Sequence, residues 1–341
     1  MSARDCFDLG INHLGCYNNS PVDHWAAQEA FRRATELDPG MCDAWMGLAT
    51  AGDITTATLR GAYEARVTMH RETRRIGLTD TALTPTVPTP VLIDLYPNTP
   101  AGTGLAYIAT LLHAGEYDAA DTVLQRIDLS GEHPQPTQIH RFLGATLHHM
   151  TQRWPDVLDW IARPASRDNG IVDVATLLLK GIAQTGLGTF EAALATLSVL
   201  PGQAEAAQLD VRGSDTQRIL AEAAFYRGLC QRALGNEATA RTEFASAIVG
   251  GELWPDAATA LNDPTYGPLV TTADAIAART SRWNPDSGPS SAEISKARQH
   301  ENAKHVLDKA ERELDEFIGL QRVKEHVNEL KFAKLYDQKM A

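Results

Sequence analysis

The segment AQEAFRRATELDP, residues 27–39, decides the fold of this chain. Its key residues Ala27, Phe31, Ala34 and Pro39 follow the spacing A-x3-F-x2-A-x4-P. Residues three and four apart share one face of a helix, so the two alanines let a partner helix approach while Phe31 fills the remaining gap. Pro39 cannot continue the helix and begins the next element. Because a single helix pair cannot bury its apolar face alone, this pattern predicts a stack of such pairs.

This spacing is the second half of a tetratricopeptide repeat, and Leu14 and Gly15 stand where the middle of its first half belongs. The pattern recurs at about the 34-residue period of that repeat. Repeats are predicted to start near Asp8, Cys42, Ala101, Gln138, Val174 and Ala221. The last of them is the clearest after the first, with Gly228, Gly235, Ala240, Phe244 and Ala247 in register. The predicted fold class is all-α: a tetratricopeptide-like α-solenoid of about six helix pairs over residues 1–262.

Two intervals between repeat starts exceed the period, so other material is inserted there. The larger insertion contains the prolines Pro85, Pro88, Pro90, Pro97 and Pro100, which forbid a helix. Its apolar residues favour extended chain: Val87, Val91, Ile93, Leu95 and Tyr96. We predict a β-hairpin finger at about residues 82–97 that projects from the array; a disordered loop is the alternative. The smaller insertion, residues 201–215, is predicted to be a surface loop.

Composition excludes several classes of protein. The chain has 341 residues, is 43% hydrophobic and carries a formal net charge of −12. This charge argues against binding to nucleic acid or to anionic membranes. No secretory signal and no apolar run of about 18 residues is present, so we expect a cytoplasmic protein without direct membrane insertion. The 4 cysteines form no C-x-x-C pair and are expected to be reduced and buried.

The repeat pattern stops after Gly250, and the C-terminal residues carry a family resemblance. Residues 263–291 have the composition of a linker, and residues 292–341 are predicted to be helical and charged. Within them, the segment Leu314–Val327 resembles the start of an AAA+ ATPase module of the CbxX/CfqX type. The segments 38–45 and 271–285 resemble EccA-type ATPases of mycobacterial type VII (ESX) secretion systems. The resemblance covers most of the chain, and it implies a tetratricopeptide array with a β-finger ahead of an AAA+ module.

One departure from that family limits the chemistry expected here. The phosphate-binding loop G-x-x-x-x-G-K-[ST] is absent, so residues 292–341 are interpreted as the leading helical segment of a truncated AAA+ domain. We therefore expect no cofactor in this fragment, with ATP and Mg²⁺ in the missing C-terminal domain, and no catalytic or metal-binding residues. His148 and His149 lack a third metal ligand at a fixed spacing. By the resemblance, the full-length protein is an ATPase that forms hexamers, whereas the fragment is expected to be a monomer.

Candidate binding residues follow from the repeat register and from local charge. First-helix positions that face the concave groove of a tetratricopeptide array are Asp43, Met46, Thr50, Asp53, Ile139, Phe142, His149, Glu222, Phe225, Leu229 and Arg232. The alternative is that several of these residues simply pack against the finger or against neighbouring helices. Arg66, Arg71, Arg74 and Arg75 form a basic patch in an acidic chain. Arginine forks suit carboxylates, so this patch is a candidate grip for an acidic partner tail, unless nearby acidic residues neutralise it.

These features favour a protein-interaction domain. The hypothesis is that it recognises secreted ESX proteins or their chaperone complexes and delivers them to the membrane secretion machinery. A finger that folds across the groove would regulate access to it, and deletion of the finger would test this hypothesis. The rival hypothesis is an autoinhibitory or structural domain that packs on its own AAA+ ring. An enzyme active within this fragment finds no support in the sequence.

Overall fold

The structure is a computed structural model that describes residues 1–16, 21–130, 134–163, 170–210 and 213–288, with Lys296 and Lys309. The segment predicted to lead into an AAA+ module therefore lies almost wholly outside the described residues. The chain divides into two compact units. The first comprises Met1–Ala273 and Arg282–Pro285; the second comprises Asp274–Ser281 and the residues from Asp286 onward.

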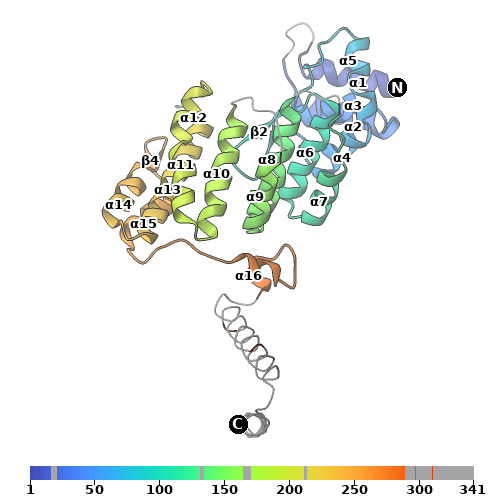
Figure 1. The fold of residues 1–341 in the computed structure, drawn as a ribbon. Coiled ribbons are helices and arrows are strands. Elements are labelled where there is room, and N and C mark those ends of the chain that lie inside the picture. Colours follow the sequence, from blue (N-terminus) through green and yellow to red (C-terminus); the bar gives the residue numbers. More distant parts are fainter. Residues whose placement is uncertain are drawn as a thin grey trace, which may run out of the picture. The chain divides into compact units, whose positions relative to one another are not determined.

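The first unit is a row of paired helices (Figure 1). The pairs are α1 (Ala3–His13) with α2 (His24–Leu37), α3 (Cys42–Thr50) with α4 (Thr56–Glu64), α6 (Pro100–His113) with α7 (Tyr117–Arg126), α8 (Pro134–Met150) with α9 (Trp154–Ala162), α10 (Ile171–Gly186) with α11 (Phe190–Ser198), and α13 (Ser214–Ala233) with α14 (Glu237–Ser246). The first helices of the later pairs also pack side by side, α6 on α8, α8 on α10 and α10 on α13. The predicted α-solenoid is confirmed.

Close approach within each pair depends on a small residue opposite a large one. A Cβ atom added to Gly228 would lie 2.5 Å from the ring of Phe244, and one added to Gly181 would lie 2.3 Å from Leu197. The turn after α13 uses Gly235, whose φ of 82° lies in the left-handed region that favours glycine. Gly228, Gly235 and Phe244 are three of the residues that the sequence placed in register in the last repeat.

The first pair departs from that register. Gly15, with a φ of 70°, lies just past the end of α1. It is Gly10 whose added Cβ would meet the Phe31 ring, at 2.7 Å. The connection between α1 and α2 is longer than the repeat allows, so α1 begins before the predicted repeat start at Asp8. The assignment of Leu14 and Gly15 to the middle of the repeat's first half was therefore wrong.

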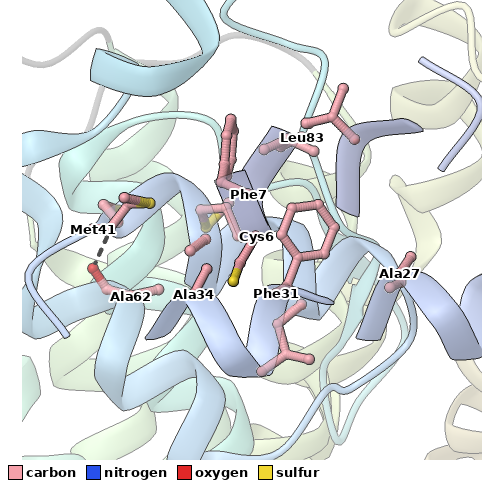
Figure 2. Close-up of a cluster of buried hydrophobic side chains, with 14 of the residues drawn as sticks. Cys6, Phe7, Ala27, Phe31, Ala34, Met41, Ala62 and Leu83 are labelled. Atoms are coloured by element: carbon pink, nitrogen blue, oxygen red, sulfur yellow. Dashed lines mark hydrogen bonds between the residues drawn. The ribbon is translucent and has the colours of Figure 1, made fainter. Parts of the chain in front are cut away.

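Phe31 lies at the centre of the N-terminal core (Figure 2). Its ring is fully buried and meets Phe7 edge-on at a centroid distance of 5.8 Å. Cys42 donates its thiol hydrogen to the carbonyl oxygen of Ala62 at 3.4 Å, and burial raises the pKa of this thiol to about 12. The prediction of buried free cysteines is confirmed for Cys6, Cys42 and Cys230, whereas Cys16 is half-buried.

The larger insertion contains more than a hairpin. It begins with the 3₁₀ turn η1 (Arg66–Thr68) and helix α5 (Arg71–Arg75), which packs on α3. The hairpin follows as β1 (Val87–Pro88) and β2 (Asp94–Leu95), paired antiparallel with Val87 opposite Leu95. Most of its apolar side chains are buried, so the finger lies against the helices instead of projecting as predicted.

After the last pair the chain forms several short elements. They are the hairpin β3 (Ile248–Val249) and β4 (Glu252–Leu253), α15 (Pro255–Asn262), α16 (Ala273–Ala277) and η2 (Pro285–Ser287). The smaller insertion, predicted to be a surface loop, starts with helix α12 (Leu200–Ala206), whose Leu200 and Ala204 are buried. Helix α15 ends at Asn262, where the sequence predicted the end of the repeat domain.

Candidate partner-binding cavity

A cavity of about 380 Å³ opens where the C-terminal ends of α8 and α10 meet the second half of α13. Two segments outside the repeats complete its walls: the tip of the finger and the chain that follows α15. Its lining residues are Val91, His149, Met150, Gln152, Trp154, Ile182, Thr185, Gly186, Phe225, Tyr226, Leu229, Tyr266, Gly267, Pro268 and Leu269. Three consecutive repeats and two segments outside the repeats therefore contribute to a single site.

The finger reaches the cavity by lying along the first helices. Strand β1 contacts α6, and the Nε2 atom of His113 lies 3.2 Å from the carbonyl oxygen of Pro88. At the tip, the Thr89 hydroxyl donates to the carbonyl oxygens of Val91 and Ile93, both at 2.7 Å. These two backbone acceptors of the tip are thus satisfied internally. The tip contributes one apolar side chain to the cavity lining, that of Val91.

Another part of the wall comes from a strap, which we define as residues 263–272 and 282–285. Arg232 of α13 donates to the carbonyl oxygens of Asp263 and Tyr266, at 3.1 and 2.9 Å. The Thr271 amide donates to the Gly186 carbonyl oxygen at the end of α10, at 2.9 Å. These bonds hold the intervening residues Tyr266–Leu269 at the cavity. The strap belongs to the segment predicted to be a linker, which is therefore bound to the solenoid in part.

The far end of the strap is anchored two repeats away. Trp283 donates its indole hydrogen to Asp118 at 2.6 Å and packs against Tyr117 and His148. Arg282 pairs with Asp121 at 2.8 Å, and Arg153 donates to the Arg282 carbonyl oxygen at 3.2 Å. The strap therefore touches four consecutive helix pairs.

The cavity wall contains no acidic or cationic side chain among its lining residues. Burial lowers the pKa of His149 to about 4, so its imidazole is neutral at physiological pH. Its Nδ1 atom is buried and has no hydrogen-bond partner within the described part of the chain. Burial also raises the pKa of Tyr226, so its phenol stays protonated. The wall is thus mainly apolar and uncharged.

The predicted groove residues of the later repeats divide into two groups. His149, Phe225 and Leu229 line the cavity. The others do not: Phe142 is fully buried, Ile139 is half-buried, Glu222 lies outside the lining, and Arg232 holds the strap and pairs with Glu237. Burial raises the pKa of Glu222 to about 7. The charge of Arg218 lowers this pKa, and the charge of Asp256 raises it.

The predicted groove residues of the second repeat are corrected by the structure. The buried carboxylate of Asp43 accepts backbone hydrogen bonds from His70, Glu72 and Thr73, at 2.7, 2.6 and 3.0 Å. Met46 is buried as well. Thr50 donates to the Met46 carbonyl oxygen, and Asp53 accepts hydrogen bonds from Thr58 and Arg32. The segment containing α5 packs on α3, so Asp43 anchors that segment instead of facing a ligand.

The basic patch is neutralised by its own surroundings. Arg74 pairs with Asp80 at 2.6 Å, and Arg71 and Arg75 both pair with the buried Glu72, at 3.0 and 2.6 Å. Arg66 donates to the Tyr63 carbonyl oxygen and stacks over that ring at 4.4 Å. Burial alone would raise the pKa of Glu72, but hydrogen bonds from Arg75, Arg4 and Arg71 hold it below its ordinary value. Of the two alternatives that the sequence left open for this patch, these ion pairs support neutralisation by nearby acidic residues.

Several cavity residues were missed because they lie outside the helix positions that the repeat register inspects. Met150, Gln152 and Thr185 sit at helix ends, and Tyr266–Leu269 belong to the strap. One signal was present in the sequence. Leu269, Val270 and Trp283 are large apolar residues inside a segment that otherwise has the composition of a linker. Such residues indicate a segment that is bound to a surface.

A pH dependence follows from the buried histidine. His149 is neutral in the fold with a pKa of about 4, whereas an unfolded histidine titrates near 6.5, so the unfolded state takes up the proton first as the pH falls. Stability is therefore lost from about pH 6.5 down to pH 4, by at most about 3 kcal/mol. We expect His149→Gln to lose less unfolding free energy than the unmodified protein between pH 7 and 4.5 in urea titrations. The exposed His24→Gln is the control, and an equal loss in both variants would contradict this assignment.

These features define a class: a tetratricopeptide α-solenoid whose inner helices carry a cavity completed by an inserted β-hairpin and a C-terminal strap. A family model described as "T7SS, ESX-1 secretion system protein EccA1, N-terminal domain" matches residues 5–289. The chain belongs to this family of type VII secretion proteins, which confirms the resemblance seen in the sequence.

Individual relatives agree with this assignment. The chain is 30% identical over 323 residues to ESX-5 secretion system protein EccA5 of Mycobacterium tuberculosis, covering 95% of this chain and 50% of that protein. It is 31% identical over 314 residues to ESX-3 secretion system protein EccA3 of Mycolicibacterium smegmatis, covering 91% and 49%. The chain thus spans about half the length of the curated relatives it matches.

A solved structure supports the fold. It is the crystal structure of the N-terminal domain of EccA1 ATPase from the ESX-1 secretion system of Mycobacterium tuberculosis. The match has a TM-score of 0.66 at 22% identity, and it covers 84% of this chain and 98% of that one. Among the described residues, no helix is long and apolar enough to cross a bilayer, and no cluster of metal-ligating side chains occurs.

Proposed function

We propose that this chain is the partner-recognition domain of a cytoplasmic type VII secretion ATPase. It binds secreted proteins or their chaperone complexes through the cavity between α8, α10 and α13, and presents them to the membrane secretion machinery. The observation that carries the proposal is the composition of the cavity. Three repeats, the finger and the strap converge on one mainly apolar, uncharged and accessible site, which is typical of a surface that captures another polypeptide.

In this proposal the binding and hydrolysis of ATP occur outside this domain. In this proposal ATP and Mg²⁺ act in a separate ATPase domain of a hexameric full-length protein, and no residue of this chain is assigned to them. This chain serves as a binding module. The proposal draws support from the family, in which the solved relative is described as the N-terminal domain of an ATPase.

A matched pair of surface variants tests the proposal. Leu269 lines the cavity and is 88% exposed, whereas Val67 is 86% exposed on η1 and is not a lining residue. We expect Leu269→Asp to weaken binding to purified secreted proteins of the same secretion system, or to their chaperone complexes, by at least about tenfold. Val67→Asp should leave binding within about twofold. Isothermal titration calorimetry with the whole chain measures both effects, and equal binding by the two variants would contradict the assigned site.

The strap supports a second candidate function. The strap joins the cavity wall to the chain that follows residue 285. In this second proposal, the strap links the cavity to the ATPase domain, and the ATPase domain covers the cavity. Under this alternative the cavity binds a segment of that ATPase ring. Binding of the isolated ATPase domain, with no binding of any secreted protein or chaperone, would favour the alternative.

A further inference from the structure

The two parts of the strap are attached to the solenoid at different places. Residues 263–272, which we call the cavity arm, supply part of the cavity lining, and residues 282–285, which we call the hook, are bound to α7 and α8. Building on the proposed function, we propose that the strap is a latch. The docked hook holds the cavity arm in place, and release of the hook loosens that arm and weakens partner binding in the cavity.

The cavity arm is held by few contacts of its own. Its polar anchors on the solenoid are the side chain of Arg232 and the carbonyl oxygen of Gly186. The ring of Tyr266 packs against α13 at a centroid distance of 6.4 Å, but Leu269 and Val270 are exposed. A segment with few buried apolar contacts opens locally at a low free energy. The cavity arm therefore depends on whatever else restrains it.

The hook is the tip of a closed loop, residues 280–287. Ser287 closes the base of this loop: its carbonyl oxygen accepts hydrogen bonds from the amide and the hydroxyl of Thr280, at 3.2 and 2.9 Å, and its hydroxyl accepts one from the Ser281 amide at 3.1 Å. A compact loop whose ends are bonded to each other behaves as one piece. Arg282 and Trp283 at its tip therefore engage or leave the helices together.

The hook meets the part of α8 that leads into the cavity wall. Trp283 donates its indole hydrogen to the carboxylate of Asp118 at 2.6 Å, which is a charge-assisted bond. Its ring lies 5.8 Å from that of His148, measured between centroids. His149, the next residue, lines the cavity. The docked hook thus packs against the same turn of α8 that contributes to the cavity.

A short stretch of chain links the two parts of the strap. Only residues 273–281 separate them, and this stretch includes α16. When a short linker joins two attachments, each keeps the other at a high effective concentration. Release of the hook removes this effect from the cavity arm. The chain enters the second compact unit at residue 274, returns at residue 282 and leaves again after residue 285, so the chain itself transmits a movement of that unit to both parts of the strap.

The backbone amide of Thr271 reports directly on the cavity arm, because it donates to the carbonyl oxygen of Gly186 on the solenoid. Its hydrogen exchange is measured by NMR spectroscopy on the whole chain. We expect Trp283→Ala to raise the exchange rate of this amide at least about tenfold, and Trp283→Phe, which keeps a ring but loses the indole hydrogen, to raise it less. The control is Trp25→Ala at an exposed position of α2, which should change the rate by less than about twofold.

A second pair of variants releases the hook from the side of the solenoid. Asp118 and Glu116 are both exposed, but only Asp118 accepts the indole hydrogen of Trp283, and Glu116 makes no side-chain capping bond at the start of α7. We expect Asp118→Ala to raise the exchange rate of Thr271 at least about threefold and Glu116→Ala to leave it within about 1.5-fold. Unchanged exchange in both Trp283→Ala and Asp118→Ala, or an equal rise at the amides of α2, would overturn the latch.

Partner binding separates the latch from the function on which it rests. We expect Trp283→Ala to weaken binding of the secreted protein or chaperone complex used for Leu269→Asp by at least about fivefold. If Thr271 exchanges faster and only Leu269→Asp weakens binding, the proposed function stands and control of the cavity by the hook is wrong. If Thr271 exchanges faster and neither variant weakens binding, the hook holds the arm but the cavity is not the partner site, and the proposed function fails.

Discussion

Phe31→Ala is expected to destabilise the N-terminal helix pairs by about 3–5 kcal/mol, as large-to-small changes at buried aromatic positions do. Phe31 is fully buried, and its ring fills the space left by Gly10 on α1 and Gly47 on α3, whose added Cβ atoms would lie 2.7 and 2.5 Å from it. Removing the ring opens a cavity between three helices at once. Neither glycine has a side chain that can fill that space.

The loss should be local, because repeats in a solenoid contact mainly their neighbours. Amide hydrogen exchange is the suitable measurement: protection in α1–α4 should fall strongly, while protection in α13 and α14 stays near its original value. Trp25→Ala, on the same helix but 73% exposed, is the control and should change stability by less than about 0.5 kcal/mol. Equal effects of the two substitutions would refute the packing scheme.

Asp43→Ala is expected to cost about 2–4 kcal/mol, since it removes a buried carboxylate that accepts three backbone hydrogen bonds. The amides of His70, Glu72 and Thr73 would lose their acceptor, and α5 would detach from α3. Urea unfolding measures the loss of stability. Asp43→Asn, which keeps one carbonyl acceptor, should lose less.

This substitution also separates the structural role from the one predicted by the sequence. If Asp43 were a groove residue, Asp43→Ala would lower partner affinity and leave stability unchanged. The control is Asp94→Ala, on an exposed position of the finger, which should be neutral in stability. A stable Asp43→Ala protein with reduced partner binding would restore the groove assignment.

The repeat architecture was predictable because the small and large residues that pack together within one helix pair lie at short, fixed spacings in the sequence. Gly228 and Phe244 had to face each other across two helices of one pair, and both occur at fixed distances within a single repeat. Proline and β-branched residues likewise marked the finger. The position of the finger against the helices was not predictable, because it depends on contacts such as that of His113 with Pro88. Such contacts leave no periodic pattern in the sequence.

The candidate site was only partly predictable for the same reason. His149, Phe225 and Leu229 lie on first helices, where the repeat register locates groove positions. The strap wall depends on contacts between distant parts of the chain, such as Trp283 with Asp118. Asp43 was misassigned because the short, charged helix α5 was not anticipated. A buried acceptor for three amides cannot be distinguished from a groove carboxylate by spacing alone.

Hydrogen–deuterium exchange of the whole chain, with and without a bound secreted protein or chaperone complex, tests the partner-binding cavity most directly. If the cavity is the binding site, protection on binding is concentrated at the finger tip, residues 89–93, at the strap, residues 266–269, and at the C-terminal ends of α8 and α10. Protection confined to the N-terminal pairs around the exposed Trp25, with these segments unchanged, would contradict the assignment.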